Sequence, residues 1–224
     1  MSRIYLVRHG QAPFGTDDYD RLTATGVAQC EQLARHWRAI GRPVDCLFSG
    51  TLRRQRDSAA AFARGFSFPD GVALVPRELP GFDECNHRAL LGGHGGGELR
   101  AASSDPREFQ CRLTQALAAW TAGDLVAFEP YGEFRARCAS ALDALLAETG
   151  RGRTVVLFAS AGSIAAAIQG VLGIGDRDAV RLKLTFYNTG VSCLLWDGDA
   201  ITIESVNAVS HLENPICTRM ITHR

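Results

Sequence analysis

The sequence predicts an α/β fold in which helices flank a mostly parallel central sheet, giving a three-layer sandwich. Short apolar segments typical of buried strands alternate with amphipathic segments typical of helices, beginning with a strand pattern at residues 4–7. Strand, helix, strand and helix follow one another in the first third of the chain, an order that favours a parallel sheet. An apolar segment at residues 154–158 and the helical pattern after it restore that order late in the chain.

The first helix is predicted from Thr23 or Thr25 to about Ile40, because a threonine can cap its start and Gly41 can end it. The other elements follow from the same periodicities: strands at 44–48, 72–75 and 154–158, helices at 51–64, 105–120, 134–148 and 163–172, and a closing hairpin of strands 191–196 and 200–206.

The regular pattern loosens between residues 80 and 132, where residues 92–97 contain five glycines. The segment at 105–120 still has helical periodicity, so it reads as a helix inserted between sheet elements. We expect one domain over residues 1–224, in which residues 83–132 form an inserted lid or cap.

Composition excludes several classes of function. The formal net charge is zero, with 24 basic and 24 acidic residues, so no broad positive surface argues for nucleic acid or an anionic membrane as partner. Seven scattered cysteines without a Cys-x-x-Cys pair favour reduced thiols and a cytoplasmic location. No apolar segment is long enough to cross a bilayer, and the amino terminus leads directly into a strand without a secretory signal pattern.

Arg8, His9 and Gly10 end the first predicted strand, where open α/β sheets bind their ligands. A guanidinium there can hold a phosphoryl group while a ring nitrogen attacks phosphorus, and a glycine lets the backbone come close. A histidine that only caps a loop is the alternative. A second basic cluster, Arg53 to Arg56, opens the next helix; Arg53 or Arg56 can face the same edge, although such clusters are usually solvated.

Taken together, these motifs resemble the histidine phosphatase superfamily, the phosphoglycerate mutase-like proteins. The matching features, in chain order, are Arg8-His9-Gly10, Leu22-Thr23-x-x-Gly26, Ser49-x-x-Leu52-Arg53, Phe82-Asp83-Glu84 and the strand and turn at 155–164. The resemblance implies a phosphoglycerate mutase-like α/β sandwich and covers nearly the whole chain.

The resemblance also implies roles for individual residues. His9 corresponds to the nucleophile that becomes a phosphohistidine, and Arg8 and Arg53 correspond to the arginines that hold the phosphoryl oxygens. Glu84 corresponds to the general acid, with Asp83 as the competing candidate; as an acid it must be protonated part of the time, which requires shielding from water. Gly10 and Gln11 are expected to line the substrate site, although Gln11 can instead order the loop.

Two departures from the family pattern affect the expected activity. Ser160 stands where the family has a second histidine, so this phosphate ligand can donate one hydrogen bond but carries no charge. His87 or His211 can compensate only if the fold brings one of them to the site. No asparagine lies between Gln11 and Asp20, which weakens the case for a mutase.

The sequence therefore predicts a phosphatase that hydrolyses a small phosphomonoester through phosphorylated His9, without metal or cofactor. A phosphate-binding protein with weakened turnover is the first alternative, because of Ser160, and a phosphoglycerate-type mutase is the second. The expected partner is a small phosphorylated metabolite; its identity and the oligomeric state do not follow from the sequence.

Overall fold

The structure, a computed structural model, describes residues 1–13, 16, 18–66, 73–93, 106–125 and 129–223. Its centre is a six-stranded sheet in the order β3-β2-β4-β1-β5-β6. The strands are β1 (Ser2–Arg8), β2 (Cys46–Ser49), β3 (Arg77–Glu78), β4 (Thr154–Ala159), β5 (Val191–Trp196) and β6 (Ile201–Ala208). The first four are mutually parallel, and β5 and β6 form an antiparallel hairpin beside β1. β1 therefore lies in the interior of the sheet, and its carboxyl end is flanked on both sides.

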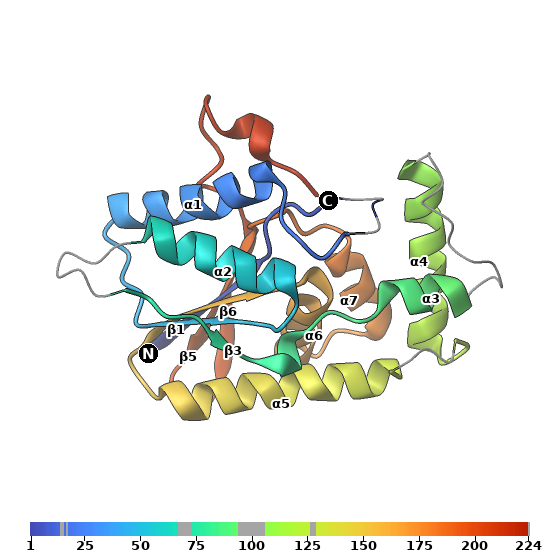
Figure 1. The fold of residues 1–224 in the computed structure, drawn as a ribbon. Coiled ribbons are helices and arrows are strands. Elements are labelled where there is room, and N and C mark those ends of the chain that lie inside the picture. Colours follow the sequence, from blue (N-terminus) through green and yellow to red (C-terminus); the bar gives the residue numbers. More distant parts are fainter. Residues whose placement is uncertain (14–15, 17, 67–72, 94–105, 126–128, 224) are drawn as a thin grey trace.

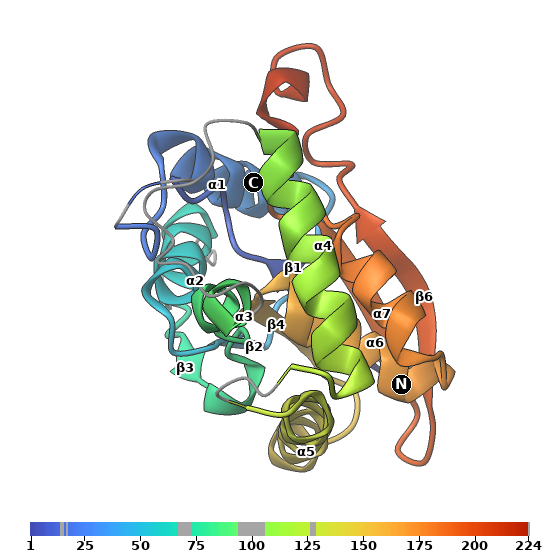
Figure 2. The same ribbon diagram turned by 90° about the vertical axis from the view of Figure 1, so that its right-hand side faces the viewer.

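Helices cover both faces of the sheet (Figures 1 and 2). On one face, α1 (Ala24–Ala39) and α2 (Arg53–Gly65) pack on the odd-numbered side chains of β1, including Tyr5. On the other face, α5 (Tyr131–Thr149) and α6 (Ala161–Leu172) pack on its even-numbered side chains, including Leu6. Since side chains alternate along a strand, β1 reads as a continuous apolar run because both of its faces are buried.

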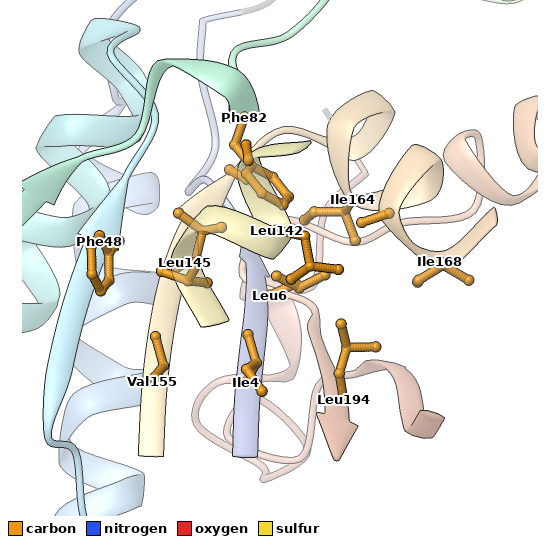
Figure 3. Packing of buried hydrophobic residues seen from close by; sticks show 14 of the residues in the cluster. Ile4, Leu6, Phe48, Phe82, Leu142, Leu145, Val155, Ile164, Ile168 and Leu194 are labelled. Atoms are coloured by element: carbon orange, nitrogen blue, oxygen red, sulfur yellow. The ribbon is translucent and has the colours of Figure 1, made fainter. Parts of the chain in front are cut away.

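The core beneath α5 and α6 also positions a loop. Phe82, in the short 3-10 helix at Pro80–Phe82, is fully buried in the cluster that contains Leu142, Leu145 and Ile164 (Figure 3). The aromatic ring thus anchors the loop that follows β3 to the hydrophobic core. Glu84, two residues later, is held close to the start of α6 as a consequence.

A third apolar cluster lies at the end of the molecule where α3 (His87–Gly93), α4 (Pro106–Ala122) and α7 (Asp176–Lys183) come together (Figure 2). Leu90, Trp120, Phe134 and Val180 are buried in it. The helices α3 and α4 fall within the segment that the sequence predicts as a lid, and most of the glycine-rich stretch within that segment lies outside the described residues.

The predicted α/β class is confirmed, and so are most predicted elements to within a few residues. The strand predicted at 72–75 is wrong: residues 73–75 are not in a strand, and β3 is formed by Arg77 and Glu78 instead. Both of these residues are exposed charged residues that pair with β2 through the backbone, so no apolar pattern marks them. α3 and α7 are not predicted. No helix among the described residues is long and apolar enough to span a membrane.

Candidate active site

His9 follows β1 directly and is almost fully buried. Its Nδ1 lies 2.8 Å from the carbonyl oxygen of Gly10, and its Nε2 lies 3.3 Å from Nε of Arg54. A carbonyl only accepts a hydrogen bond and a guanidinium only donates one, so the ring proton is on Nδ1 and the lone pair on Nε2. The imidazole is thus held in the tautomer whose Nε2 can act as a nucleophile.

The surroundings of His9 also fix its charge. Burial lowers the pKa of the imidazole, and the guanidinium groups of Arg54 and Arg8 lower it further, to well below its ordinary value. Because a neutral imidazole is the nucleophilic form, His9 is available for attack at neutral pH without the help of another base.

Arg54 is the second buried cation of the site. Its Nη1 donates to Oδ1 of Asp20 at 2.8 Å, and its guanidinium lies over the ring of Tyr19, with 5.2 Å to the ring centroid. The same carboxylate accepts the N–H groups of Arg53 and Arg54, in the first turn of α2. Asp20 therefore satisfies the start of the helix and fixes the guanidinium beside His9 at the same time.

The structure corrects the expectation for Arg53. Its side chain is 59% exposed and forms an ion pair with Asp57, with 3.6 Å between Nε and Oδ2. Arg56 is also exposed and pairs with Glu78. Consecutive residues of a helix differ by about 100° in direction, so the residue that faces His9 is Arg54 and not its neighbour.

Arg8 enters from the end of β1 and is buried. Its Nη1 donates to the carbonyl oxygen of Phe186 at 2.5 Å and to that of His223 at 2.7 Å. Its buried Nε has no hydrogen-bond partner among the described residues. A buried donor without a partner is costly, so an anion that accepted a hydrogen bond from this atom would remove that cost.

Gly10 and Gln11 hold the nucleophile loop in place. The N–H of Gly10 donates to Ser58 and its carbonyl accepts from His9; a Cβ at this position would overlap the carbonyl oxygen of Gly26. The side-chain oxygen of Gln11 accepts the hydroxyl of Thr23 at 2.8 Å. The contacts shown for these two residues are thus structural, and contact with substrate stays a prediction for both.

The carboxylates of Asp83 and Glu84 point to different neighbours. Asp83 accepts both the N–H and the hydroxyl of Thr51, which ties the loop to the end of β2. Glu84 is directed to the start of α6, where its Oε2 accepts the N–H of Gly162 at 3.0 Å. Of the two candidates, only Glu84 is left to face the site, and it is close enough to affect the pKa of His9 and of Arg8.

The pKa of Glu84 is low although its side chain is buried. Burial acts to raise it, but the Lys183 ammonium, the N–H of Gly162 and the Arg54 guanidinium together lower it to about 2. The expectation that this carboxyl is protonated part of the time therefore gains no support from the pKa and stays a prediction. Lys183 was not expected at the site, because α7 gave no clear signal in the sequence.

Ser160 caps α6 in the turn after β4 and is almost fully buried. Its Oγ accepts the side-chain N–H of Gln55 at 3.0 Å, and the same nitrogen donates to the carbonyl oxygen of Phe82. Gln55 therefore links α2, the loop before Glu84 and the α6 turn. The hydroxyl hydrogen of Ser160 stays available for an acceptor.

Neither alternative histidine is shown at the site. His211 is buried with its Nε2 2.9 Å from the hydroxyl of Thr189, whose N–H donates to the carbonyl of Arg8; no contact between His211 and His9 is shown among the described residues. The side chain of His87 lies outside the described part of the chain.

Sequence comparison decides the family. Residues 4–209 match the model of the histidine phosphatase superfamily (branch 1). The chain belongs to this superfamily. The match includes the first strand with Arg8 and His9, the α2 cluster with Arg54, and the α6 turn, so this histidine phosphatase superfamily member contains its site residues within the matched region. No curated protein matches the chain.

Solved structures similar to this superfamily member include several phosphatases. A histidine-to-alanine mutant of Entamoeba histolytica phosphoserine phosphatase, in complex with phosphoserine, aligns with TM-score 0.66 and 18% identity over 95% of this chain and 100% of that one. Mycobacterial glucosyl-3-phosphoglycerate phosphatase, in complex with inorganic phosphate, aligns with a TM-score of 0.64 and 22% sequence identity, over 93% of this chain and 98% of that one. Bacillus stearothermophilus YhfR aligns with a TM-score of 0.69 and 14% sequence identity, over 94% of this chain and 99% of that one. These likenesses establish the phosphoglycerate mutase-like fold.

Proposed function

We propose that the protein is a phosphatase that hydrolyses a small phosphorylated metabolite through a phosphohistidine at His9. The observation that carries the proposal is the arrangement around Nε2 of His9: its lone pair lies beside Arg54, and Arg8 adds a buried Nε–H that has no partner within the described part of the chain. The named substrates of the similar structures, phosphoserine and glucosyl-3-phosphoglycerate, support a phosphomonoester as substrate class.

In the first step, Nε2 of His9 forms a bond to phosphorus while the bond from phosphorus to the leaving oxygen breaks; its electron pair stays on that oxygen, which takes up a proton to form the alcohol product. The Nδ1–H of His9 keeps its hydrogen bond to the carbonyl oxygen of Gly10, and the guanidinium groups of Arg54 and Arg8 offset the charge on the phosphoryl oxygens. In the second step, water attacks phosphorus, the bond to Nε2 breaks and inorganic phosphate leaves. Glu84, in its carboxylate form, accepts the proton of that water.

No step of this reaction requires a metal ion, because the protein supplies its own cations. We therefore propose that activity is metal-independent.

We also propose that α3 and α4 belong to a lid over the substrate. Because the cysteines are free thiols, we propose a cytoplasmic location for the protein.

The test is turnover of a generic aryl phosphate with and without chelator, with trapping of the phosphorylated protein. We expect activity that resists the chelator and a phosphoryl group on His9 that is stable to base and labile to acid. His9→Ala should abolish both, and His36→Ala, on the outer part of α1, should leave both intact. Unchanged turnover by His9→Ala would exclude the proposal.

A phosphate-binding protein with weak turnover is the second candidate, favoured by Ser160. Its hydroxyl is neutral and already accepts from Gln55, so the α6 turn offers no cation to the phosphoryl group. Titration with vanadate beside the turnover assay separates the candidates, because tight binding without product supports this one. Ser160→His should then raise the turnover rate.

A further inference from the structure

The ring of Tyr19 lies on the face of the Arg54 guanidinium, with 5.2 Å between Cζ and the ring centroid. The tyrosine is half-buried, whereas the side chain of Arg54 is only 6% exposed. An aromatic ring within about 6 Å attracts a cation through its π face, and the attraction grows as water is excluded. Tyr19 is therefore a second partner, beside Asp20, for a buried cation that the proposed reaction uses.

The other contacts of Arg54 lie in the plane of its guanidinium. Nε donates to Nε2 of His9 at 3.3 Å, and Nη1 donates to Oδ1 of Asp20 at 2.8 Å. Nη2 has no hydrogen-bond partner among the described residues. Hydrogen bonds in the plane restrain the group less against tilting out of that plane, which is the movement that a ring on its face restricts. Tyr19 and Asp20 thus restrain the same group in two directions.

A ring on the face differs from a further carboxylate in what it leaves available. A carboxylate would neutralise the cation and accept its N–H groups, which are the donors that phosphoryl oxygens need. A ring accepts none of the in-plane N–H groups. The carboxylate of Asp20 is 44% exposed, so solvent screens part of its attraction. Arg54 therefore keeps Nη2, and much of its charge, for an incoming anion.

The turn that carries the ring is tied to the helix that carries Arg54. The N–H of Arg21 donates to the carbonyl oxygen of Tyr19 at 2.8 Å, and the side chain of Arg21 pairs with Asp18 at 2.9 Å. Asp20, between them, accepts two backbone N–H groups in the first turn of α2. The position of the ring relative to the guanidinium is thus set by contacts within one small unit.

Tyr19 also lies near the other cation of the proposed site. Burial lowers the pKa of Arg8, and among the neighbouring groups Tyr19 acts most strongly to raise it, ahead of Glu84. The buried Nε of Arg8 lacks a partner within the described part of the chain, as does Nη2 of Arg54. A phenol close to both guanidinium groups borders the space in which a phosphoryl group would contact them.

We infer that Tyr19 is a positioning residue of the phosphoryl site: its ring holds the guanidinium of Arg54 beside Nε2 of His9 and leaves the charge and the N–H groups of that guanidinium to the phosphoryl group. The inference rests on the phosphoryl site proposed above. Tyr19 acts through Arg54, and its ring rather than its hydroxyl carries the effect.

The experiment measures kcat/KM for an aryl phosphate and the dissociation constant of vanadate. Tyr19→Leu removes the ring, so it should lower kcat/KM about 5–30-fold and weaken vanadate binding by a similar factor, the range that a cation–π contact supplies. Tyr19→Phe keeps the ring and should stay within about twofold of the unmodified protein. Asp18→Asn is the matched control: it removes an exposed ion pair from the same turn and should leave both quantities unchanged.

A double-mutant cycle tests whether Tyr19 acts through Arg54. In an Arg54→Gln background, which lacks the cation, Tyr19→Leu should change kcat/KM and vanadate binding less than about twofold. A merely structural role of the ring would give the same loss in both backgrounds. Because vanadate binding needs no turnover, it completes the cycle even where the double variant is too slow to assay.

Circular dichroism checks that each variant is folded, and Tyr19→Met is a second variant without a ring in case Tyr19→Leu does not fold. Unchanged values in the ringless variant, equal losses in Tyr19→Phe, or the full loss in the Arg54→Gln background each overturn the inference alone. No turnover by the unmodified protein overturns the proposed phosphatase function instead, and vanadate binding then still tests the role of the ring.

Discussion

Nε of Arg54 lies 3.3 Å from Nε2 of His9, and the other side of the same guanidinium is held by Asp20. The arginine thereby bridges a fixed carboxylate and the atom that we propose as the nucleophile. Since its position is set before any substrate binds, the stabilisation it offers requires little reorganisation.

This relationship predicts opposite behaviour for two adjacent arginines. Arg54→Lys should lower kcat/KM for an aryl phosphate by about 10²–10³-fold, because lysine lacks the planar group that contacts Asp20 and His9 together. Arg53→Lys should change it less than about twofold, since this side chain is exposed and its pair with Asp57 contributes little. Comparable losses in both variants would contradict the placement of Arg54.

Packing of the nucleophile loop against α1 predicts a stability effect. A Cβ on Gly26 would overlap the backbone of Gln11, so Gly26→Ala should lower the free energy of unfolding by about 1–3 kcal/mol in urea denaturation. Gly170→Ala is the matched helical control. Apart from its own helix backbone, none of the described residues has an atom within 4 Å of its added Cβ, so this variant should be more stable by about 0.5–1 kcal/mol.

Buried histidines predict loss of stability in acid. Burial, and to a lesser degree the charge of His36, lowers the pKa of His211 from 6.5 to about 3. Below about pH 6.5 the unfolded chain binds a proton at His211 that the folded chain excludes, so stability falls as the pH falls toward 3. Between pH 6.5 and 5 this amounts to about 2 kcal/mol.

The variant His211→Asn should remove that part of the pH dependence, measured as the free energy of unfolding in urea at each pH. His9 contributes in the same direction, so some dependence should persist. Glu84 acts at lower pH: its pKa is about 2 instead of 4.5, so its contribution is complete above about pH 4.5 and is lost below it. If the free energy of unfolding of His211→Asn changed with pH as steeply as that of the unmodified protein, His211 would not titrate as described.

Removal of residues 218–223 should lower activity while the rest of the chain stays folded. The carbonyl of His223 accepts from Arg8, and Thr222 bonds to Asn188, whose side chain in turn donates to the carbonyl of His9. Ending the chain after Cys217 should therefore misplace Arg8 and lower kcat/KM by about 10²-fold, as small misplacements do. The thermal unfolding midpoint should fall as well, because the buried side chain of Gln29 and the N–H of Asn188 lose their partners, but the variant should still be folded at the assay temperature by circular dichroism. Unchanged kinetics would exclude this role.

Sequence reasoning singled out His9 because it ends a strong apolar strand, and Glu84 because of its place in the order of motifs; the catalytic roles of both stay predictions. It placed the second arginine one residue too early. The phase of α2 carries the missing signal: Arg54 lies four residues before Ser58 and eight before Phe62, on the buried stripe, whereas Arg53 lies four before the charged Asp57.

Other parts of the site have no local signal. Lys183 reaches Glu84 across 99 residues of chain, and Gln55 reaches Ser160 across 105. Contacts of this kind depend on how α6 and α7 pack, which periodicity within one segment does not determine. β3 was missed for a similar reason, since its two charged residues are a strand only because β2 lies beside them.

The contacts of Arg8 have a consequence for biosynthesis. Its guanidinium is oriented by carbonyls that lie 178 and 215 residues further along the chain. A ribosome-bound polypeptide that has not yet emerged to Phe186 already contains the imidazole and both arginines but not their final arrangement. The proposed reactivity toward phosphate compounds is thus acquired only after Phe186 and His223 have both left the ribosome, as expected for contacts of high sequence separation.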